Sequence, residues 1–499
     1  MIEAVSVAQM RESDAAAVRS GVPAEELMMR AARGVFGSYP WKGRTAVVCG
    51  SGNNAGDGYA LALLLRGAGV PCRVLRLTEA ATPVGSIYLE QCRRAGIPME
   101  TVTEKPDFSG DAEIADCIFG TGFHGNAEGI YRNAIEAINQ SGLPVVSVDI
   151  NSGMNGDSGL GDPAVRSTVT VSVGSPKAGH YLADAKDRIG RLLNVDIGIP
   201  IVGEPYRLLE AADVRAALPP RRRNSHKGTY GYVGILGGCT RYAGAAKLAN
   251  LGASAMRAGC GVVTLGVPSS LAAAVAPCLL ESTLAPMPES GGCMAFDPAA
   301  INAFLAGKRA VAVGMGWGEG SDYPAILTHL LENFSGSLLL DADALNTLSR
   351  MDRSLLRRAA GRVILTPHPK ELERLSGVPM DEILSDPVAA AKDFAGKYRV
   401  ILLLKGATTV VTDGETAYLS DRGCAGMATA GSGDVLSGVL AGLLGYLPPT
   451  ALTVACGAYL AGYAGELAEA SENPVSMVAS DTVAALPRAL SRILNGTAP

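Results

Sequence analysis

Short apolar runs, each followed by a polar or glycine-rich turn and then a helical segment, recur along this chain of 499 residues. Such alternation is typical of parallel strands joined by crossover helices. In the first half, strands are expected at residues 45–49, 72–77, 115–119, 145–150, 168–173 and 192–196. In the second half, they are expected at residues 232–236, 262–267, 310–314, 338–340, 363–365 and 400–404. The sequence therefore predicts an α/β protein with ligand sites beyond the carboxyl ends of its strands.

A segment rich in proline and arginine separates the two halves. It contains Pro200, Pro205 and Pro219-Pro220, and Arg221-Arg222-Arg223 follows them. Because proline interrupts both helices and strands, we expect a domain boundary near residue 215. This divides the chain into domains of residues 1–214 and 215–499, each with its own α/β sheet.

The composition is that of a large globular protein. Of its residues 48% are apolar and 18% are charged, and the net charge of −5 argues against general nucleic-acid binding. The ten cysteines are scattered, and the first residues do not resemble a signal peptide, so free thiols and a cytoplasmic location are expected. Residues 435–465 are uncharged, but Pro448-Pro449 interrupts them, which favours two packed helices over a membrane span.

Three polar turns follow three expected strands of the first half, at residues 50–58, 120–126 and 149–153. Because parallel strands end at one edge of their sheet, these turns are expected to lie together. Glycine amides of the second turn suit a diphosphate, and oxygens of Asn54, Asp116 and Ser152 suit a monovalent cation. Asp149 is placed for proton transfer. The alternative is that these residues only form the bends.

The second half contains a glycine–acid element, Gly431-Ser432-Gly433-Asp434, ahead of an apolar helix. Amide groups at such a helix start stabilise a phosphoryl group in transfer, and Asp434 is placed to accept a proton from the attacking hydroxyl. Residues 405–409 follow a strand and suit a nucleotide phosphate. The alternative for the element is a helix cap without a ligand. Asp341 and Asp343 could face a substrate or hydrated Mg²⁺, or could cap the next helix.

Five motifs of the first half resemble the NAD(P)H-hydrate epimerase family across residues 6–209. They are Gln9-Met10-Arg11, Leu27-Met28-Met29-Arg30-Ala31-Ala32, Asn53-Asn54-Ala55-Gly56-Asp57-Gly58, Asp116-Cys117-Ile118-Phe119-Gly120-Thr121-Gly122 and Val148-Asp149-Ile150-Asn151-Ser152-Gly153. The resemblance implies a Rossmann-like three-layer sandwich with Asp149 as the catalytic residue. It implies that K⁺ is held by Asn54, Asp116 and Ser152. The implied hydrate-binding residues are Asn53, Asn54, Ala55, Gly56, Asp57, Gly120, Thr121, Gly122, Phe123, His124, Gly125, Asn126 and Asp149.

Two residues depart from this family's pattern. Ala55 replaces a glycine, so that its position must adopt a negative φ. Asn151 replaces a proline before the Ser-Gly pair. Neither change removes one of the implied side-chain ligands.

The second half resembles the NAD(P)H-hydrate dehydratase family, which has a ribokinase-like fold, across residues 216–494. The motifs are His226-Lys227-Gly228-Thr229-Tyr230-Gly231, Gly237-Gly238, Tyr242-Ala243-Gly244-Ala245, Gly314-Met315-Gly316, Asp341-Ala342-Asp343-Ala344-Leu345-Asn346, Pro367-His368-Pro369-Lys370-Glu371, Lys405-Gly406 and Gly431-Ser432-Gly433-Asp434. The resemblance implies a three-layer α/β/α domain with Asp434 as the catalytic residue. The implied hydrate ligands are Ala243, Gly316, His368 and Asp434, and the implied ADP ligands are Lys405, Gly406, Ala407, Thr408, Thr409, Gly431, Ser432 and Gly433.

Together the resemblances imply a bifunctional isomerase and lyase that repairs nicotinamide nucleotides. One half would interconvert the R and S hydrates of NADH or NADPH. The other would dehydrate the S form with ADP and Mg²⁺, releasing AMP and phosphate. The expected partners are these small molecules and further copies of the chain, without nucleic acid or membrane. Two alternatives stay open: a ribokinase-like small-molecule kinase, and a first half that is a non-catalytic binding module.

Overall fold

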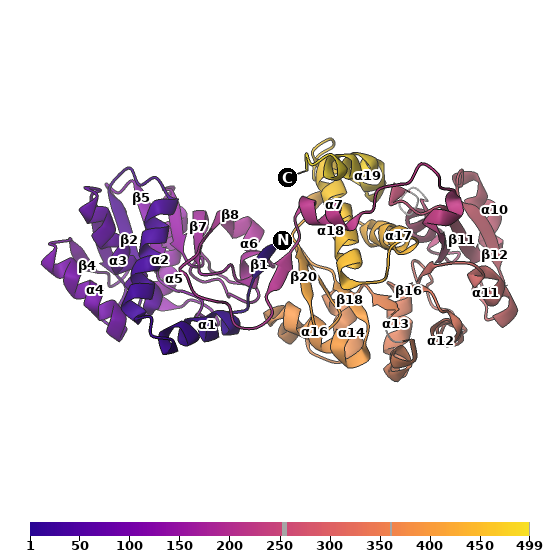
Figure 1. The fold of residues 1–499 in the computed structure, drawn as a ribbon, viewed down its shortest axis with the longest axis horizontal. Coiled ribbons are helices and arrows are strands. Elements are labelled where there is room, and N and C mark those ends of the chain that lie inside the picture. The colour runs from indigo at the N-terminus through magenta and orange to yellow at the C-terminus, as the bar shows by residue number, and fades with distance from the viewer. Residues whose placement is uncertain (252–256, 360–361, 499) are drawn as a thin grey trace. The chain divides into compact units, whose positions relative to one another are not determined.

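The structure, a computed structural model, describes residues 1–251, 257–359 and 362–498. The chain forms two compact units (Figure 1). The N-terminal unit is Glu3–Tyr206, and the C-terminal unit is Arg207–Pro499 together with Met1–Ile2. The division lies before the expected boundary at residue 215, because β9 (Tyr206–Leu208) pairs in parallel with β20 (Ala417–Ser420). The segment before the arginine run therefore already contributes to the second sheet.

The N-terminal unit contains a parallel sheet in the order β4-β3-β2-β5-β6-β7-β8. Its strands are β2 (Thr45–Cys49), β3 (Cys72–Arg76), β4 (Met99–Thr101), β5 (Glu113–Cys117), β6 (Val145–Val148), β7 (Ser167–Val173) and β8 (Ile189–Val195). Six of these were predicted from the sequence, and the short edge strand β4 was not. Because all the pairings are parallel, the turns after β2, β5 and β6 lie at one edge of the sheet, as expected.

Helices cover both faces of this sheet. They are α1 (Val7–Arg19), α2 (Ala24–Ser38), α3 (Asn53–Gly67), α4 (Pro83–Arg94), α5 (Gly129–Gln140) and α6 (Ala185–Arg188). Successive residues of β2 point to opposite faces: Val47 packs in the cluster of α2, α3 and α4, and Val48 packs in that of α5. Helix α3 begins at Asn53 and not at the expected residue 57, so both asparagines lie in its first turn.

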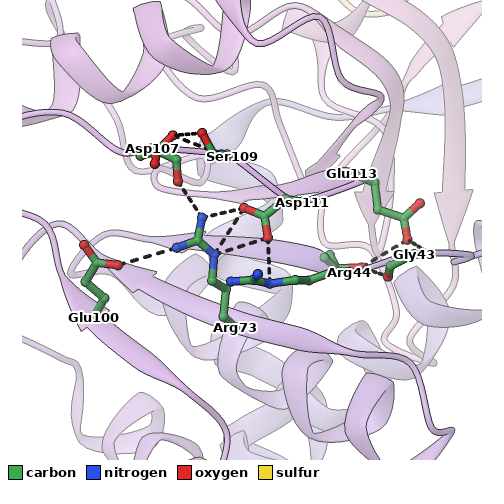
Figure 2. Close-up of polar contacts among 9 residues, drawn as sticks. Gly43, Arg44, Arg73, Glu100, Asp107, Ser109, Asp111 and Glu113 are labelled. Carbon is green, nitrogen blue, oxygen red and sulfur yellow. Dashed lines mark hydrogen bonds and ion pairs between the residues drawn. The ribbon is translucent and has the colours of Figure 1, made fainter.

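A buried charge cluster occupies the other end of the sheet, where strands β2, β3 and β5 begin (Figure 2). Its centre is Asp111, whose carboxylate is fully buried and pairs with Arg73 Nη2 at 2.5 Å and Arg44 Nε at 3.2 Å. Arg73 also reaches Glu100 at 3.5 Å and donates a hydrogen bond to the Asp107 carbonyl at 2.5 Å. The cluster ties neighbouring strands together and lies at the end of the sheet opposite the predicted site.

The C-terminal unit contains a larger sheet, in the order β1-β9-β20-β19-β18-β17-β16-β15-β10-β11-β12, in which β1 is Ile2–Ala4. Its further strands are β10 (Tyr232–Leu236), β11 (Val262–Pro268), β12 (Thr283–Met287), β15 (Ala310–Val313), β16 (Ser337–Leu340), β17 (Val363–Leu365), β18 (Ile401–Leu404) and β19 (Thr409–Thr412). Strands β10 to β12 and β15 to β18 pair in parallel, whereas β18, β19 and β20 form antiparallel pairs. Residues 405–408 are therefore the turn of a hairpin. A separate ribbon pairs β13 (Glu289–Ser290) with β14 (Cys293–Met294).

The helices of this unit are α7 (Ala211–Ala217), α8 (Ala243–Asn250), α10 (Ala272–Val275), α11 (Pro298–Leu305), α12 (Tyr323–Asn333), α13 (Asp343–Ser349), α14 (Pro369–Ser376), α15 (Met380–Ser385), α16 (Pro387–Tyr398), α17 (Ser432–Leu444), α18 (Ala451–Glu469) and α19 (Ala479–Leu494). A helix was predicted over residues 243–258, of which 252–256 lie outside the described residues.

The uncharged stretch at residues 435–465 forms two packed helices, α17 and α18, as predicted. They approach closely, since a Cβ on Gly457 would lie 2.5 Å from Leu440 Cδ2. Across residues 1–251, 257–359 and 362–498, no helix is both long and apolar enough to span a membrane.

Candidate active sites

A cavity of about 860 Å³ lies at the predicted edge of the N-terminal sheet. One wall consists of the turns after β2, β5 and β6, and another consists of helices α1 and α2. Of the predicted hydrate-binding residues, the cavity is lined by Asn53, Asn54, Asp57, Gly120, Thr121, Gly122, Phe123, His124 and Asp149. Ala55, Gly56, Gly125 and Asn126 do not line it. Gly56 instead allows close helix packing, because a Cβ there would lie 2.6 Å from Met28 Sδ.

Asp149 follows β6 in a strained conformation, with a φ of 66°. A non-glycine residue in this left-handed region costs about 1–3 kcal/mol and persists only where its surroundings hold it. The Asp149 amide donates to the Val171 carbonyl at 2.8 Å, and its Oδ1 accepts from the Val173 amide at 3.3 Å. Oδ1 also forms an ion pair with Lys177. These contacts fix the carboxylate at the cavity wall.

Lys177 is buried, with 1% of its side chain exposed. Besides Asp149, its Nζ donates to the Val173 carbonyl at 2.8 Å. A buried ammonium is stable only when an opposite charge and further hydrogen bonds replace its water. Lys177 therefore neutralises Asp149 and orients it. Lys177 was not predicted from the sequence, although it lies in the turn after the expected strand 168–173.

His180 holds the backbone of Asp149. Its Nδ1 accepts from the Lys177 amide at 3.0 Å, so the ring proton is on Nε2, which donates to the Asp149 carbonyl at 2.9 Å. Burial, and secondarily the nearby Lys177, lowers the pKa of His180 to about 4. The ring is therefore neutral near pH 7. It supports the left-handed conformation of Asp149 without adding charge.

Two further carboxyl groups line the cavity, from Asp14 on α1 and Asp57 on α3. Within the described part of the chain, neither accepts a hydrogen bond nor forms an ion pair. Burial raises the pKa of Asp14 to about 6, although Lys177 acts to lower it. Burial, with Asp149 and Asp14 nearby, raises the pKa of Asp57 well above its usual range. The cavity thus combines one neutralised carboxylate with two groups that hold protons more readily than ordinary aspartates.

The three predicted cation ligands lie together, and Asn54 among them lines the cavity. Asn54 donates through Nδ2 to the Phe119 carbonyl at 2.7 Å, and its Oδ1 is buried without a hydrogen-bond partner among the described residues. Ser152 Oγ lies 2.5 Å from Asp116 Oδ1 and 3.4 Å from the same Phe119 carbonyl. Burial raises the pKa of Asp116, so a cation would favour its charged form. An orphaned amide oxygen, a hydroxyl and a buried carboxylate are donors that suit K⁺.

The two departures from the family pattern both have local explanations. Ala55 lies inside α3 and is not among the residues with positive φ, as its side chain requires. Asn151 is fully buried, and its Nδ2 donates to the Val165 carbonyl at 2.9 Å and the Arg188 carbonyl at 3.1 Å. It therefore clamps the turn that carries Ser152.

A second group of charged residues gathers at the carboxyl edge of the C-terminal sheet. Lys405 Nζ lies 2.9 Å from Asp341 Oδ1 and 3.8 Å from Glu371 Oε2. Asp341 also accepts from Ser437 Oγ of α17 at 2.7 Å. Burial acts to lower the pKa of Lys405, but Asp341 and Glu371 raise it above its ordinary value. Lys405 was predicted to meet a nucleotide, and in this structure its ammonium pairs with these carboxylates.

Asp434 lies in the first turn of α17, beside this pair. Burial, and secondarily the nearby Asp341, raises the pKa of its carboxyl to about 7. The helix is preceded by Gly431 with a φ of 96°, and Ser432 Oγ is buried without a hydrogen-bond partner in the described ranges. A free hydroxyl among amides at the start of a 13-residue helix suits an anion.

The remaining predicted ligands of the second site surround these groups. Gly316, with a φ of 67°, packs against the start of α8, since a Cβ there would lie 2.6 Å from the Tyr242 carbonyl. This close approach brings the Gly316 turn next to Ala243. His368 caps α14, and its Nδ1 accepts from the Glu371 amide at 3.3 Å. Burial and the nearby Lys405 lower the pKa of His368.

The uncertain pair Asp341 and Asp343 proves to be divided. Asp341 belongs to the charged group around Lys405, whereas Asp343 Oδ2 accepts from the Gly318 amide at 2.7 Å. Ala342 between them has a φ of 49°. No group of three or more His, Cys, Asp or Glu side chains able to hold a metal is found in residues 1–251, 257–359 and 362–498. A magnesium ion here would therefore depend on a nucleotide for most of its ligands.

Separate family models match a part of each of the two units. Residues 24–179 match the family model described as YjeF-related protein N-terminus, and residues 233–488 match that of NAD(P)H-hydrate dehydratase. A ribokinase-like protein of Enterococcus faecalis covers 58% of the chain, and the chain covers 96% of it, at 23% identity with a TM-score of 0.52. This likeness supports a ribokinase-like fold for the C-terminal unit.

Curated relatives match over most of the chain. The bifunctional NAD(P)H-hydrate repair enzyme of Moorella thermoacetica is 36% identical over 472 residues, which cover 90% of this chain and 88% of the relative. The enzyme of the same name from Coxiella burnetii is 33% identical, with coverage of 95% and 96%. The chain belongs to the family of bifunctional NAD(P)H-hydrate repair enzymes.

Proposed function

We propose that this protein repairs hydrated NADH and NADPH in two reactions. The N-terminal unit epimerises the R and S hydrates, and the C-terminal unit dehydrates the S form, with the division at Arg207 in place of residue 215. One observation carries the proposal. Each unit holds a lysine–aspartate ion pair at the carboxyl edge of its sheet, beside a second aspartate whose pKa is raised. Perturbed acids in such positions are typical of proton-transfer sites.

In the first site, the turn at residues 120–124 and the start of α3 bind the substrate, and Asp149 exchanges protons with the hydrate at C6. Lys177 and His180 hold Asp149 in place for this step. Asn54, Asp116 and Ser152 would hold K⁺, whose charge would stabilise the buried Asp116 carboxylate. The main-chain amides around Gly120 would face the diphosphate.

In the second site, the oxygen of the C6 hydroxyl attacks the terminal phosphoryl group of the nucleotide. Asp434 accepts the proton of that hydroxyl during the attack. Amides of Gly431 to Gly433 stabilise the transferring group. The new phosphate ester then leaves as phosphate, because the lone pair of the ring nitrogen forms a C=N bond. Loss of the C5 proton completes NAD(P)H. With ADP as the donor, the other product is AMP, and Mg²⁺ would screen the nucleotide charge.

Absorbance of the reduced nicotinamide ring tests both reactions. Mixed R and S NADH hydrate is incubated with the protein, Mg²⁺, K⁺ and either ADP or ATP. Recovery of the whole mixture supports both reactions and identifies the nucleotide. Recovery of the S fraction alone limits the protein to dehydration, and no recovery with either nucleotide overturns the proposal in favour of a small-molecule kinase. The proposal includes a homo-oligomer, which light scattering of the purified chain tests.

A further inference from the structure

Asp14 is a cavity residue to which the mechanism above gives no role. It lies on helix α1, which forms one wall of the first cavity, whereas Asp149 belongs to the sheet-edge wall. Asp149 is held by Lys177 and by the Val173 amide. Asp14, in contrast, has no hydrogen bond or ion pair among the residues that the structure describes. An unpartnered carboxyl group in a binding cavity is available to a ligand.

We propose that Asp14 is a second catalytic acid–base group, which works with Asp149 from another wall of the same cavity. This inference rests on the proposed epimerase function and goes beyond it by naming the group that completes the proton transfers. An epimerase must handle the hydroxyl group on both faces of the reacting carbon. Two carboxyl groups supplied by two walls meet this requirement, and one carboxyl group does not.

The reaction begins with Asp14 protonated and Asp149 ionised. Asp14 gives its proton to the C6 hydroxyl while the C6–O bond breaks, and the lone pair of the ring nitrogen forms a C6=N bond as water leaves. Another water molecule attacks C6 from the opposite face, and its electron pair forms the new C6–O bond. That water gives a proton to Asp149 while the C6=N electrons return to nitrogen. The pair of aspartates retains one proton, and the reverse reaction uses the groups in exchanged roles.

The surrounding charges suit Asp14 to this role. The charged or titratable groups that share its cavity are Lys177, Asp149, Asp57, Arg11 and His124. Burial raises the pKa of Asp14 to about 6. A group with a pKa close to neutral pH can both hold a proton and release it to the substrate. Asp14 lies on α1, whereas none of the proposed K⁺ ligands does. K⁺ would therefore not be bound by a residue next to Asp14 in the chain.

Asp57 is less suited to the same role. It lies on α3, in the turn that follows β2, and so belongs to the same sheet-edge wall as Asp149. Burial raises its pKa well above the usual range, which favours a carboxylic acid that keeps its proton. Asp57 is therefore assigned to hydrogen bonding with the substrate.

The test compares Asp14→Asn with Glu12→Gln in the full-length protein. Glu12 lies on the same helix but is exposed and pairs with Arg19 at 2.6 Å, so its variant is the matched control. Pure S hydrate is supplied without nucleotide, and the R hydrate is measured by chromatography. Asp14→Asn should lower kcat about 10²- to 10⁴-fold, as expected for loss of a general acid, with little change in KM. Thermal unfolding of the same samples reports on the folding of the N-terminal unit, and nucleotide-dependent dehydration of S hydrate reports on that of the C-terminal unit.

Two further readouts separate a catalytic role from a structural one. In the wild type, kcat/KM in the direction that begins with protonated Asp14 should fall above pH 6 as Asp14 loses its proton, and the residual activity of Asp14→Asn should lack this decline. Epimerisation in H₂¹⁸O should introduce one ¹⁸O atom at C6 per inversion. Unchanged kcat in Asp14→Asn, a retained alkaline decline or inversion without ¹⁸O would each overturn the role of Asp14. A wild type that does not epimerise would instead overturn the proposed function itself.

Discussion

The two sites contain similar lysine–aspartate pairs that differ in burial. The side chain of Lys177 is 1% exposed, and its ammonium is fully engaged by Asp149 and the Val173 carbonyl. The side chain of Lys405 is 22% exposed and faces two carboxylates, Asp341 and Glu371. The first pair therefore fixes the proposed catalytic carboxylate, whereas the second leaves a cation near the surface where an incoming anion can reach it. The same kind of ion pair, lysine with aspartate, can thus have different roles in two sites when the exposure of the lysine to solvent differs.

Backbone strain is distributed differently in the two units as well. In the N-terminal unit the non-glycine residues with positive φ are Asp149, at 66°, and Ala183, at 44°. Among the described residues of the C-terminal unit they are Ala342, at 49°, which separates Asp341 from Asp343, and Arg399, at 55°. In the first site the strained residue is thus Asp149, the proposed catalytic group. In the second site it is Ala342, and the aspartates on either side of it, Asp341 and Asp343, have different partners. Substitutions at the two strand ends should therefore differ in their effects.

The largest expected effect comes from Asp149→Asn. Asparagine tolerates the left-handed conformation, but its amide can neither exchange the proton nor balance the charge of the buried Lys177 ammonium, so unfolding of the N-terminal unit is measured alongside activity. We expect epimerisation to fall by about 10³-fold or more, at the upper part of the range for general acid–base groups. Nucleotide-dependent dehydration of pure S hydrate should be unchanged. Asp434→Asn is the reciprocal control, and equal loss of both reactions in either variant would contradict two independent sites.

Replacing each lysine with methionine tests the difference in burial. Lys177→Met leaves the Asp149 carboxylate without its cation, and breaking a buried pair costs about 3–5 kcal/mol. Lys405→Met should cost less, because the Lys405 side chain is 22% exposed, so that water already screens its ion pairs, and Asp341 keeps the hydrogen bond from Ser437 Oγ. Denaturant unfolding, with hydrogen exchange to assign each transition to a unit, measures the two losses. Equal losses would show that exposure does not distinguish the pairs.

Titration of Asp434 gives the next effect. Its carboxyl has a raised pKa of about 7, so the neutral form is favoured in the folded state and its stabilising effect is lost as the pH rises through 7. Dehydration requires the ionised form, so kcat/KM should rise about tenfold per pH unit below 7 and then level off. Asp434→Asn should raise the free energy of unfolding at pH 8 by on the order of 2 kcal/mol, and by much less at pH 5. The isosteric variant Asp343→Asn is the control, because the wild-type Asp343 carboxylate accepts a hydrogen bond from the Gly318 amide. This variant should lower the free energy of unfolding at both pH values.

The smallest effect concerns the cation. Replacement of K⁺ by Li⁺ in the assay should slow epimerisation several-fold, because the smaller ion fits the oxygens of Asn54, Asp116 and Ser152 less well. Dehydration of pure S hydrate should not respond in the same way. Asn54→Leu removes the unpaired amide oxygen and should abolish the difference between the two ions. A K⁺ effect that survives in Asn54→Leu would place the ion elsewhere.

Much of the fold and many site residues could be predicted from the sequence, because the signals are local. Apolar runs of three to six residues indicated most of the strands, and the polar turns after them indicated Asp149, Asn54 and Asp434. The parallel topology then brought these turns to one edge in each unit. The beginning of α3 was misplaced, because Asn53 and Asn54 are typical of turns but here occupy the first helical positions.

The missed residues act through contacts that only the fold creates. An isolated lysine such as Lys177 is usually exposed, and nothing in its sequence reveals that its ammonium is buried against Asp149. His180 depends on the turn that returns it to the Asp149 carbonyl. Asp14 lies in a helix far from the glycine-rich turns, so its place in the cavity follows from packing alone. For Lys405 the residue was identified but its partners, Asp341 and Glu371, were not.

The close contact between α17 and α18 makes catalysis sensitive to residues remote from the substrate. Asp434 lies at the start of a helix whose later turns pack so tightly on α18 that Gly457 leaves no room for a methyl group beside Leu440. A bulkier side chain at Gly457 must move Leu440 or the helix that carries it. Core mutations in this interface are therefore expected to shift the Asp434 carboxylate and to lower turnover while every ligand-contacting residue stays intact.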